Sequence, residues 1–235
     1  LIYNQLNKEL YQKFNMTPDE LDACNDGYIY IHDMVARRDT FNCCIYDVEN
    51  VLHGGFEMGN VWYNEPKSID TAFDVIGDIV LSAAAQQYGG FTIPEIDKIL
   101  EPYALKSYNN YLNDYAECNG FWSYDDMITF SKTTGITTDR KNAAHDYAMK
   151  KVNRDIEQGF QGWEYKFNTV GSSRGDYPFI SISFGLSQSV FGKMINKACL
   201  KVRMNGQGKD GYKKPVLFPK LTFLYDKNLH GPNKI

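Results

Sequence analysis

The sequence contains no hydrophobic run long enough to cross a membrane. The longest apolar stretch, residues 79–85, is short and is interrupted by Ser82, whereas a membrane-spanning helix needs about 20 apolar residues. The first residues also lack the basic region, apolar core and small-residue cleavage site of a secretory signal. We therefore expect a cytoplasmic chain that has no membrane partner.

Cysteine and histidine are scarce, and neither has the spacing of a metal site. The 235 residues include five cysteines and four histidines, without the C-x-x-C pairs that are typical of zinc sites. An odd number of cysteines outside a disulfide spacing is typical of a reducing compartment. We expect these residues to hold no metal ion and to form no disulfide framework.

An excess of positive charge is also missing. The chain has 25 Lys and Arg residues against 29 Asp and Glu residues, which gives a formal net charge of −4. Proteins that bind nucleic acid usually carry a basic patch, so the composition argues against a nucleic-acid partner. The contents of 43% hydrophobic and 23% charged residues are those of a globular protein.

What the sequence does contain is a pair of adjacent cysteines, Cys43 and Cys44, in a segment with strand character. Side chains alternate along a strand, so the two thiols are expected to point to opposite faces. Unpaired cysteine is often simply a small buried side chain, and the residues alone leave that interpretation open. The alternative is that a rigid strand positions one thiol for chemistry.

The hydrophobic pattern alternates between helical and strand periods. Ser68 precedes apolar residues at helical spacing that continue to Gly89 and Gly90, and Thr92 and Glu95 have capping-box spacing before a second helix. Helices are also expected at residues 6–14, from Pro18 onward, at 139–167 and at 189–204; the expected strands are residues 28–32, 41–48, 179–184 and 216–225. Strands joined by long helical crossovers predict an α/β architecture with parallel pairing.

Several motifs, in order along nearly the whole chain, resemble one enzyme family. They are GYIYIHD at 27–33, NCCIYD at 42–47, GFEMGN at 55–60, EPKS at 65–68, QYGG at 87–90 and LFPKL at 217–221. The family is the anaerobic (class III) ribonucleoside-triphosphate reductases, which are glycyl-radical enzymes. The resemblance implies an enzyme that reduces ribonucleoside triphosphates to 2′-deoxyribonucleoside triphosphates for DNA synthesis.

The resemblance implies that Cys43 donates a hydrogen atom to the substrate radical from an inner barrel strand. Strand alternation makes Cys44 face away from Cys43, so we assign Cys44 to packing. That role requires the protonated thiol, and a buried, weakly polar position would keep it protonated. Asn42 and His32 are the other expected catalytic residues. The family often has a second histidine where this chain has Tyr30, so only His32 matches that motif.

Two further groups of site residues follow from the resemblance. Lys67 and Ser68, before a helix, are expected to contact the phosphates of a deoxynucleoside triphosphate or ATP effector, because helix N-termini attract anions. An ordinary cap beside a surface lysine is the alternative. Ser172 and Ser173 lie in a loop similar to a family Ser-Ser-Asn-Gly-Gln loop, and we expect them to bind substrate.

The same resemblance sets the expected architecture. Residues 1–235 would form a single, partial catalytic domain, about the first half of a ten-stranded α/β barrel. The N-terminal regulatory region, the glycyl radical and a zinc site would lie outside these residues. Formate is the expected reductant, a radical S-adenosylmethionine iron–sulfur activase the expected partner, and a homodimer the expected assembly.

Two alternatives remain from the sequence. The chain could be a catalytically incomplete fragment that only binds nucleotides or dimerises. It could instead be related to pyruvate formate-lyase, a glycyl-radical acyltransferase that uses both members of an adjacent cysteine pair. The residues that flank Cys43 and Cys44 do not match that enzyme, which favours the reductase.

Overall fold

The computed structural model describes residues 2–31, 34, 42–87, 89–171 and 177–232. Along this part of the chain the elements are α1 (Ile2–Asn15), α2 (Pro18–Asn25), β1 (Cys44–Ile45), α3 (Val48–Leu52), β2 (Phe56–Met58), β3 (Val61–Tyr63), α4 (Ile69–Gln86), β4 (Phe91–Ile93), α5 (Ile96–Cys118), α6 (Tyr124–Thr134), α7 (Thr137–Thr169), β5 (Ile180–Phe184), α8 (Val190–Asn205), β6 (Lys220–Phe223) and α9 (Lys227–His230). Within these residues, no helix is long and apolar enough to span a membrane.

Four short strands form a parallel sheet in the order β1-β4-β5-β6. Cys44 is in register with Phe91, and Phe91 is in register with Ile180. A separate antiparallel hairpin joins β2 to β3. Because the parallel strands follow one another through helices, the mixed α/β architecture predicted from the sequence is confirmed.

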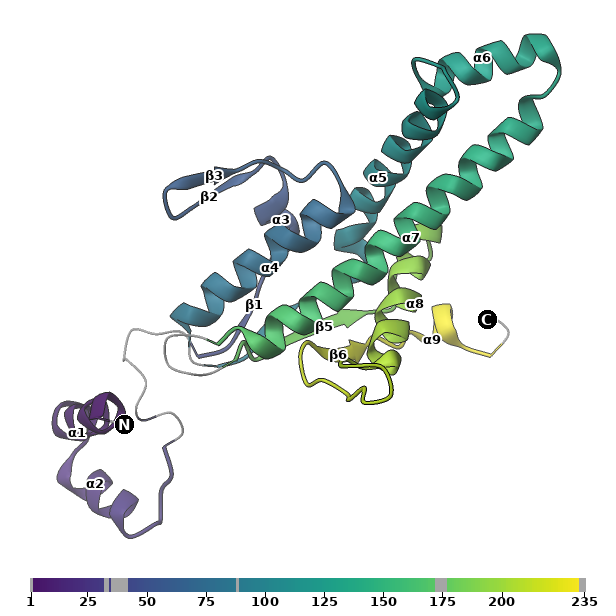
Figure 1. The fold of residues 1–235 in the computed structure, drawn as a ribbon. Helices are drawn as coiled ribbons and strands as arrows, with labels where there is room; N and C mark the ends of the chain where they lie inside the picture. The colour runs from purple at the N-terminus through teal and green to yellow at the C-terminus, as the bar shows by residue number, and fades with distance from the viewer. Residues whose placement is uncertain (1, 32–33, 35–41, 88, 172–176, 233–235) are drawn as a thin grey trace.

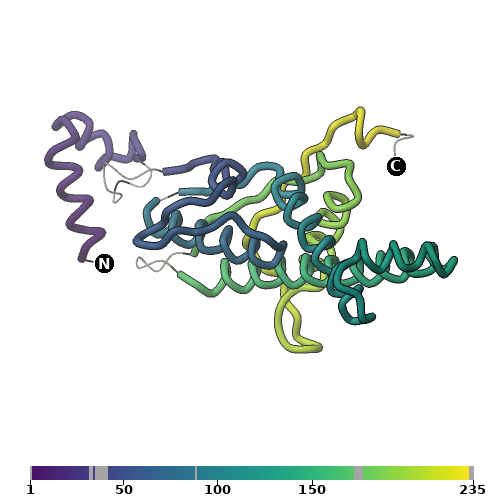
Figure 2. Tube along the Cα trace, turned by 90° about the horizontal axis from the view of Figure 1, so that it is seen from above, coloured from purple at the N-terminus to yellow at the C-terminus, as the bar shows by residue number. Residues whose placement is uncertain are grey.

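Helices cover one face of the sheet (Figures 1 and 2). Phe91 and Ile93 of β4 and Ile180, Ile182 and Phe184 of β5 are buried in one hydrophobic cluster with residues of α4, α5, α7 and α8. The intervening residues of the same strands point to the other face, because side chains alternate along a strand. The sheet therefore has one packed face and one open face.

The long helix α7 shows why the packed face is well defined. Its buried residues recur every three or four positions and form one stripe: Ala144, Ala148, Val152, Ile156, Phe160, Trp163 and Phe167. The indole Nε1–H of Trp163 donates to the Phe73 carbonyl oxygen of α4 at 2.8 Å, and the two rings meet edge to face. The C-terminal part of the stripe thus fixes α7 against α4, whereas Ala144 and Ala148 pack in a second cluster with residues of α5 and α6.

The helices α1 and α2 lie apart from the sheet and contribute no buried residue (Figure 1). The helix start predicted at Pro18 is confirmed. Thr17 Oγ1 accepts from the Glu20 N–H, and the Glu20 side chain accepts from the Thr17 N–H, so the two residues form a capping box.

Several predicted elements differ from the structure. Residues 28–31 form no strand, and His32 lies outside the described residues. The strand expected at residues 41–48 is reduced to Cys44–Ile45, because Asp47 caps helix α3, which begins at Val48. The strand expected at 216–225 is limited to Lys220–Phe223. Each segment is rich in aromatic and β-branched residues, which predict a strand. The part of the segment that pairs with another strand is shorter than this composition suggests.

The capping box predicted at Thr92 and Glu95 is wrong. Thr92 lies in β4, where its hydroxyl is 2.7 Å from the Ser181 hydroxyl of β5. Glu95 adopts a left-handed conformation at the start of α5 and makes no side-chain cap. Ser68 does occupy the N-cap position of α4, but its hydroxyl pairs with Thr71 Oγ1 instead of a backbone N–H.

Two glycines of α7 give a matched test of the packing of α7 against α4. A Cβ at Gly159 would lie 2.2 Å from the Phe73 ring, whereas a Cβ at Gly162 meets nothing within 4 Å. We expect Gly159→Ala to destabilise the chain by about 1–3 kcal/mol through overpacking. Gly162→Ala is expected to stabilise it by up to about 1 kcal/mol through helix propensity. Urea unfolding of both variants checks this, and equal effects would contradict the close α4–α7 contact.

Candidate active-site face

The two adjacent thiols meet different partners, as strand alternation predicts. Cys43 is exposed, and its Sγ accepts a hydrogen bond from the Gly90 N–H at 3.3 Å. The same sulfur lies 3.8 Å from Asn42 Oδ1. Cys43 precedes β1 and lies next to the glycines that lead into β4. It therefore belongs to the open face of the sheet.

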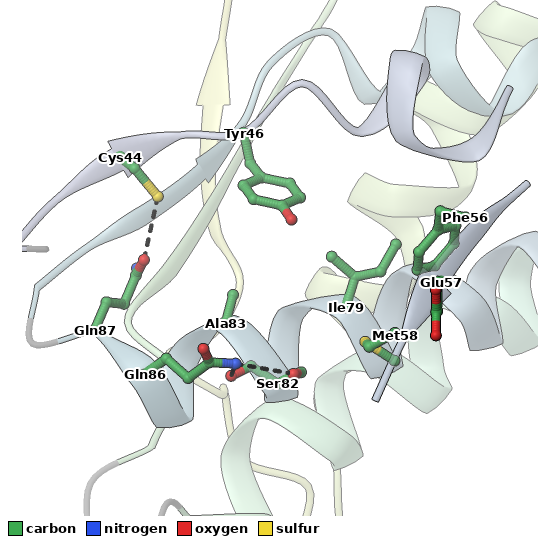
Figure 3. Close-up of a pocket in the computed structure, with 10 residues that line it drawn as sticks. All are labelled: Cys44, Tyr46, Phe56, Glu57, Met58, Ile79, Ser82, Ala83, Gln86 and Gln87. Carbon is green, nitrogen blue, oxygen red and sulfur yellow. Dashed lines mark hydrogen bonds between the residues drawn. The ribbon is translucent and has the colours of Figure 1, made fainter. Parts of the chain in front are cut away.

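Cys44 points toward helix α4. Its Sγ–H donates to Gln87 Oε1 at 3.2 Å, and the side chain packs against the main hydrophobic core. Burial raises the pKa of the Cys44 thiol, which keeps it protonated. Cys44 also lines a pocket of about 400 Å³ with side chains from α4 and β2, including Ile79 and Met58 (Figure 3).

The expected burial of Cys43 is wrong for this chain, because the side chain is exposed. The reason is that no described element covers the open face beside β1. Ile45, the next residue with the same orientation, is 77% exposed. The exposure of Cys43 thus follows from the position of β1 at the edge of the sheet.

Polar side chains continue along the open face. Ile45, Thr92, Ser181 and Lys220 are in register across the four strands. The hydroxyls of Thr92 and Ser181 are hydrogen-bonded to each other, and Ser183 Oγ accepts from the Glu95 N–H at 2.9 Å. The ammonium of Lys220 lies 3.9 Å from the centre of the Phe179 ring. The face offers a thiol, hydroxyls and one positive charge.

Of the two glycines before β4, one is required for the close approach of the chain to Cys43. A Cβ at Gly89 would lie 2.2 Å from Asn42 Oδ1 and 2.6 Å from Cys43 Sγ. A Cβ at Gly90 would lie in ordinary contact, 3.9 Å from Cys43 Sγ and 3.6 Å from the Phe179 ring. Gly89 is therefore the position at which a side chain would displace Asn42 and Cys43.

The structure brings Asn42 together with Cys43, but Lys67 and Ser68 lie at a distance. Cys44 contacts Gln87, just after the C-terminal end of α4, whereas Lys67 and Ser68 precede its N-terminus. The 18 residues of α4 separate the two ends by about 27 Å. Lys67 is exposed, and the first N–H of α4, at Ile69, is bonded to Ser107 Oγ. His32, Ser172 and Ser173 lie outside the described residues.

Sequence reasoning missed Gln87, Thr92 and Lys220 as residues of this region. Ser181 and Ser183 alternate with apolar residues in the strand predicted at residues 179–184, which is long enough to show the alternation. Thr92 was assigned to a helix cap, since a strand of only three residues gives almost no periodic signal. The glycines at positions 89 and 90 were the sequence signal that could have located this region, because glycine in a strand often marks a close approach of another backbone.

No group of three or more His, Cys, Asp or Glu side chains gathers as a metal site in the described ranges. The zinc site that the resemblance implies was expected outside these residues. Cys199 is buried in the main core, and burial raises its pKa to about 12. Such a thiol is inert packing in this chain.

Comparison with known proteins identifies the class of this arrangement. Residues 1–233 match the family described as anaerobic ribonucleoside-triphosphate reductase. The chain therefore belongs to the anaerobic ribonucleoside-triphosphate reductase family.

Individual relatives agree with this assignment. The enzyme of that name from Haemophilus influenzae is 36% identical over 223 residues, which are 94% of this chain and 28% of the relative. The one from Enterobacteria phage T4 is 32% identical over 219 residues, which are 92% of this chain and 32% of the relative. The chain thus spans 27–32% of the length of these and two further curated relatives.

A solved structure supports the fold. The anaerobic ribonucleotide reductase from Thermotoga maritima, with dATP bound in its specificity site, aligns with a TM-score of 0.54 at 15% identity. The alignment covers 94% of this chain and 34% of that chain. The α/β arrangement described above is therefore an arrangement found in this family.

The different surroundings of the cysteines predict an order of alkylation. In the native chain at pH 8, iodoacetamide is expected to label the exposed Cys43 and Cys118 first, Cys44 more slowly and Cys199 last. Because burial raises the pKa of Cys44, its labelling should continue to accelerate above the pH at which an ordinary thiol is fully ionised. Peptide mass spectrometry over time checks the order. Faster labelling of Cys44 than of Cys43 would contradict the two-face arrangement.

Proposed function

We propose that this chain is part of the catalytic subunit of an anaerobic ribonucleoside-triphosphate reductase, and that Cys43 is its hydrogen-donating thiol. The observation that carries the proposal is the position of Cys43 on the open face of a parallel sheet, beside Asn42, in a chain that belongs to this family. Cys44 is excluded from the same role because it faces α4 and is bonded to Gln87.

In the proposed reaction the glycyl radical, stored outside these residues, supplies the radical that starts the reaction through a cysteine elsewhere in the protein. That cysteine radical takes the hydrogen atom from C3′ of the ribose. The C2′ hydroxyl then leaves as water with the proton of the C3′ hydroxyl, so that a ketone forms at C3′ and the radical lies at C2′. The S–H bond of Cys43 then breaks homolytically, and its hydrogen atom forms a C–H bond with the substrate radical. Formate, the proposed reductant, gives a hydrogen atom back to the Cys43 sulfur and transfers its second electron to the C3′ ketone, which takes up a proton, so that formate leaves as carbon dioxide. The first cysteine then returns a hydrogen atom to C3′ and is again a radical. The role of Cys43 requires a thiol that is positioned and protonated, which is the protein's contribution.

The open face supports the proposed barrel. We propose that residues 1–235 form a partial catalytic domain, about the first half of a ten-stranded barrel whose interior is lined by this face. The strands β1 and β6 each have a parallel neighbour on one side within the described residues. Closing a sheet into a barrel requires further strands at such edges and side chains that alternate between interior and exterior. The exposed Ile45 would then be covered.

The proposed ligands follow from the family. A ribonucleoside triphosphate is the proposed substrate, with Asn42, His32, Ser172 and Ser173 as proposed contacts. Deoxynucleoside triphosphates or ATP are the proposed effectors, with contacts from Lys67 and Ser68. The Thermotoga relative binds dATP in a specificity site, which supports an effector site in this family. A homodimer and a radical S-adenosylmethionine activase are the proposed partners, with zinc held outside these residues.

The alternative of a non-catalytic, nucleotide-binding fragment is tested with the isolated chain. Radical reduction needs a stored radical, a thiyl relay and a donor thiol in one site, and we assign only the donor to these residues. The isolated chain should form no deoxynucleotide with activase, S-adenosylmethionine, formate and nucleotide, even if it binds nucleotide. The family match is to the anaerobic ribonucleoside-triphosphate reductases, which favours the reductase over a relative of pyruvate formate-lyase.

The role of Cys43 is tested by substitution in the full reductase polypeptide that contains this chain. Cys43→Ser should abolish deoxynucleotide formation, because the O–H bond of serine is a very poor hydrogen-atom donor. The loss should exceed about 1,000-fold, which corresponds to about 4 kcal/mol in the barrier. Product formation is measured under strict anaerobiosis, with circular dichroism to confirm the fold.

Cys44→Ala and Cys118→Ser are the matched controls. Cys44→Ala should retain most activity and lose about 1 kcal/mol of stability or less, since only one small half-buried side chain is shortened. Cys118 is exposed at the end of α5, so its substitution should change neither activity nor stability. Full turnover by Cys43→Ser would remove Cys43 from the reaction.

The effector role of Lys67 gives a separate prediction. Lys67→Ala in the intact dimer should weaken deoxynucleoside-triphosphate binding about 3- to 10-fold, as expected for one charged contact to a phosphate. Turnover without effector should not change. Lys209→Ala, at an exposed turn after α8, is the control. Isothermal titration calorimetry with each effector measures the affinities, and unchanged affinity for all of them would exclude Lys67 from the effector site.

A further inference from the structure

We propose that Gln87 is a positioning residue for Cys43 and that it acts through the peptide unit between Gly89 and Gly90. This inference rests on the proposed function, since it assigns a further residue to the same thiol. Gln87 lies on the packed face of the sheet, with 7% of its surface exposed, while Cys43 lies on the open face. The two side chains are connected by backbone hydrogen bonds.

The oxygen and the nitrogen of the Gln87 side-chain amide contact different groups. Its Oε1 accepts a hydrogen bond from the Cys44 thiol at 3.2 Å (Figure 3). Its Nε2 donates to the carbonyl oxygens of Gly89 at 3.5 Å and of Gly90 at 3.3 Å. Both carbonyl contacts are long, so neither is strong alone. Together with burial they hold one end of the amide at the cysteine pair and the other at the two glycines.

The N–H groups of the same glycines point the other way, to the residues of the proposed site. The Gly89 N–H donates to the Asn42 carbonyl oxygen at 2.6 Å. The Gly90 N–H donates to Cys43 Sγ at 3.3 Å. The Gly90 carbonyl oxygen also accepts from the Cys44 N–H at 3.0 Å, which is part of the pairing of β1 with β4.

The Gly89 carbonyl and the Gly90 N–H belong to one peptide unit. A trans peptide is planar, and its C=O and N–H bonds point in opposite directions. When Gln87 Nε2 holds the carbonyl on one side of the sheet, the N–H must therefore point to the other side, where Cys43 Sγ accepts it. Gln87 thus controls the only backbone donor that the described residues give to this sulfur.

Glycine at both positions makes such control necessary. A side chain at Gly89 would displace Asn42 and Cys43, so the close approach requires glycine. Glycine has the widest choice of backbone conformations, so a peptide unit between two glycines rotates easily unless other groups hold it. The buried amide of Gln87 supplies that restraint from the face that carries no proposed substrate contact.

Amide hydrogen exchange at Gly90 tests the restraint directly in the full reductase polypeptide. In Gln87→Met, which keeps the length of the side chain and loses its donor, exchange of the Gly90 N–H should accelerate about tenfold or more, since local opening becomes easier. Gln87→Glu keeps an acceptor for Cys44 but also lacks the donor, so it should show the same acceleration. The control is Gln86→Met, because the Gln86 amide bonds to Ser82 within α4.

Kinetics of the same variants separate positioning from stability. Both Gln87 variants should lose about tenfold or more in kcat with little change in KM, because a small displacement of a reacting group slows the chemical step. Gln87→Glu, which is close in shape to glutamine, keeps the test available if Gln87→Met does not fold. Thermal unfolding identifies folded variants before either measurement.

The outcomes distinguish this proposal from the one on which it rests. Unchanged Gly90 exchange in a folded Gln87 variant, or a kcat no lower than that of Gln86→Met, would overturn the role of Gln87. Full turnover by Cys43→Ser would overturn the proposed function instead. The exchange rate of the Gly90 N–H does not depend on whether Cys43 reacts. The exchange result therefore tests the role of Gln87 independently of the turnover of Cys43→Ser.

Discussion

The short parallel pairing of β1 with β4 is the constraint on which the candidate site depends. Backbone hydrogen bonds at its two ends, from the Cys44 N–H to the Gly90 carbonyl and from the Tyr46 N–H to the Thr92 carbonyl, flank the paired residues. They fix the register, and a shift of one residue would exchange the faces of Cys43 and Cys44. The core side chains Phe91 and Ile93 hold β4 in that register from the packed face.

The same pairing explains why the two faces differ in chemistry. Residues that alternate with core positions emerge on the open face, where Thr92 and Ser181 supply hydroxyl groups. Ser183 lies on the same side but is buried, and its hydroxyl accepts from the Glu95 N–H. Their neighbours Phe91, Ile180 and Ile182 are buried under helices. One set of strands therefore supplies both the stable core and the polar surface, and changes to the polar surface need not disturb the core.

How far the sequence predicted this arrangement depended on element length. The helices α7 and α8 and the strand β5 were predicted nearly to their ends, because repeated apolar spacing identifies long elements. The strands β1 and β4, of two and three residues, leave no such pattern, and their pairing is decided by tertiary contacts. The opposite facing of Cys43 and Cys44 was predictable from alternation alone. The exposure of Cys43 was not, since it depends on which elements cover the face.

The divergence of the two thiols has a consequence for oxidation. A cysteine that is oxidised to a sulfenic acid is commonly rescued when a nearby thiol condenses with it to form a disulfide. Cys44 is the nearest thiol in sequence to Cys43, but it faces α4, is held by Gln87 and has a raised pKa. It is therefore poorly placed to resolve an oxidised Cys43. Damage to the exposed thiol would proceed to irreversible acids unless a thiol from outside this part of the chain intervened, which gives the site little tolerance of oxygen.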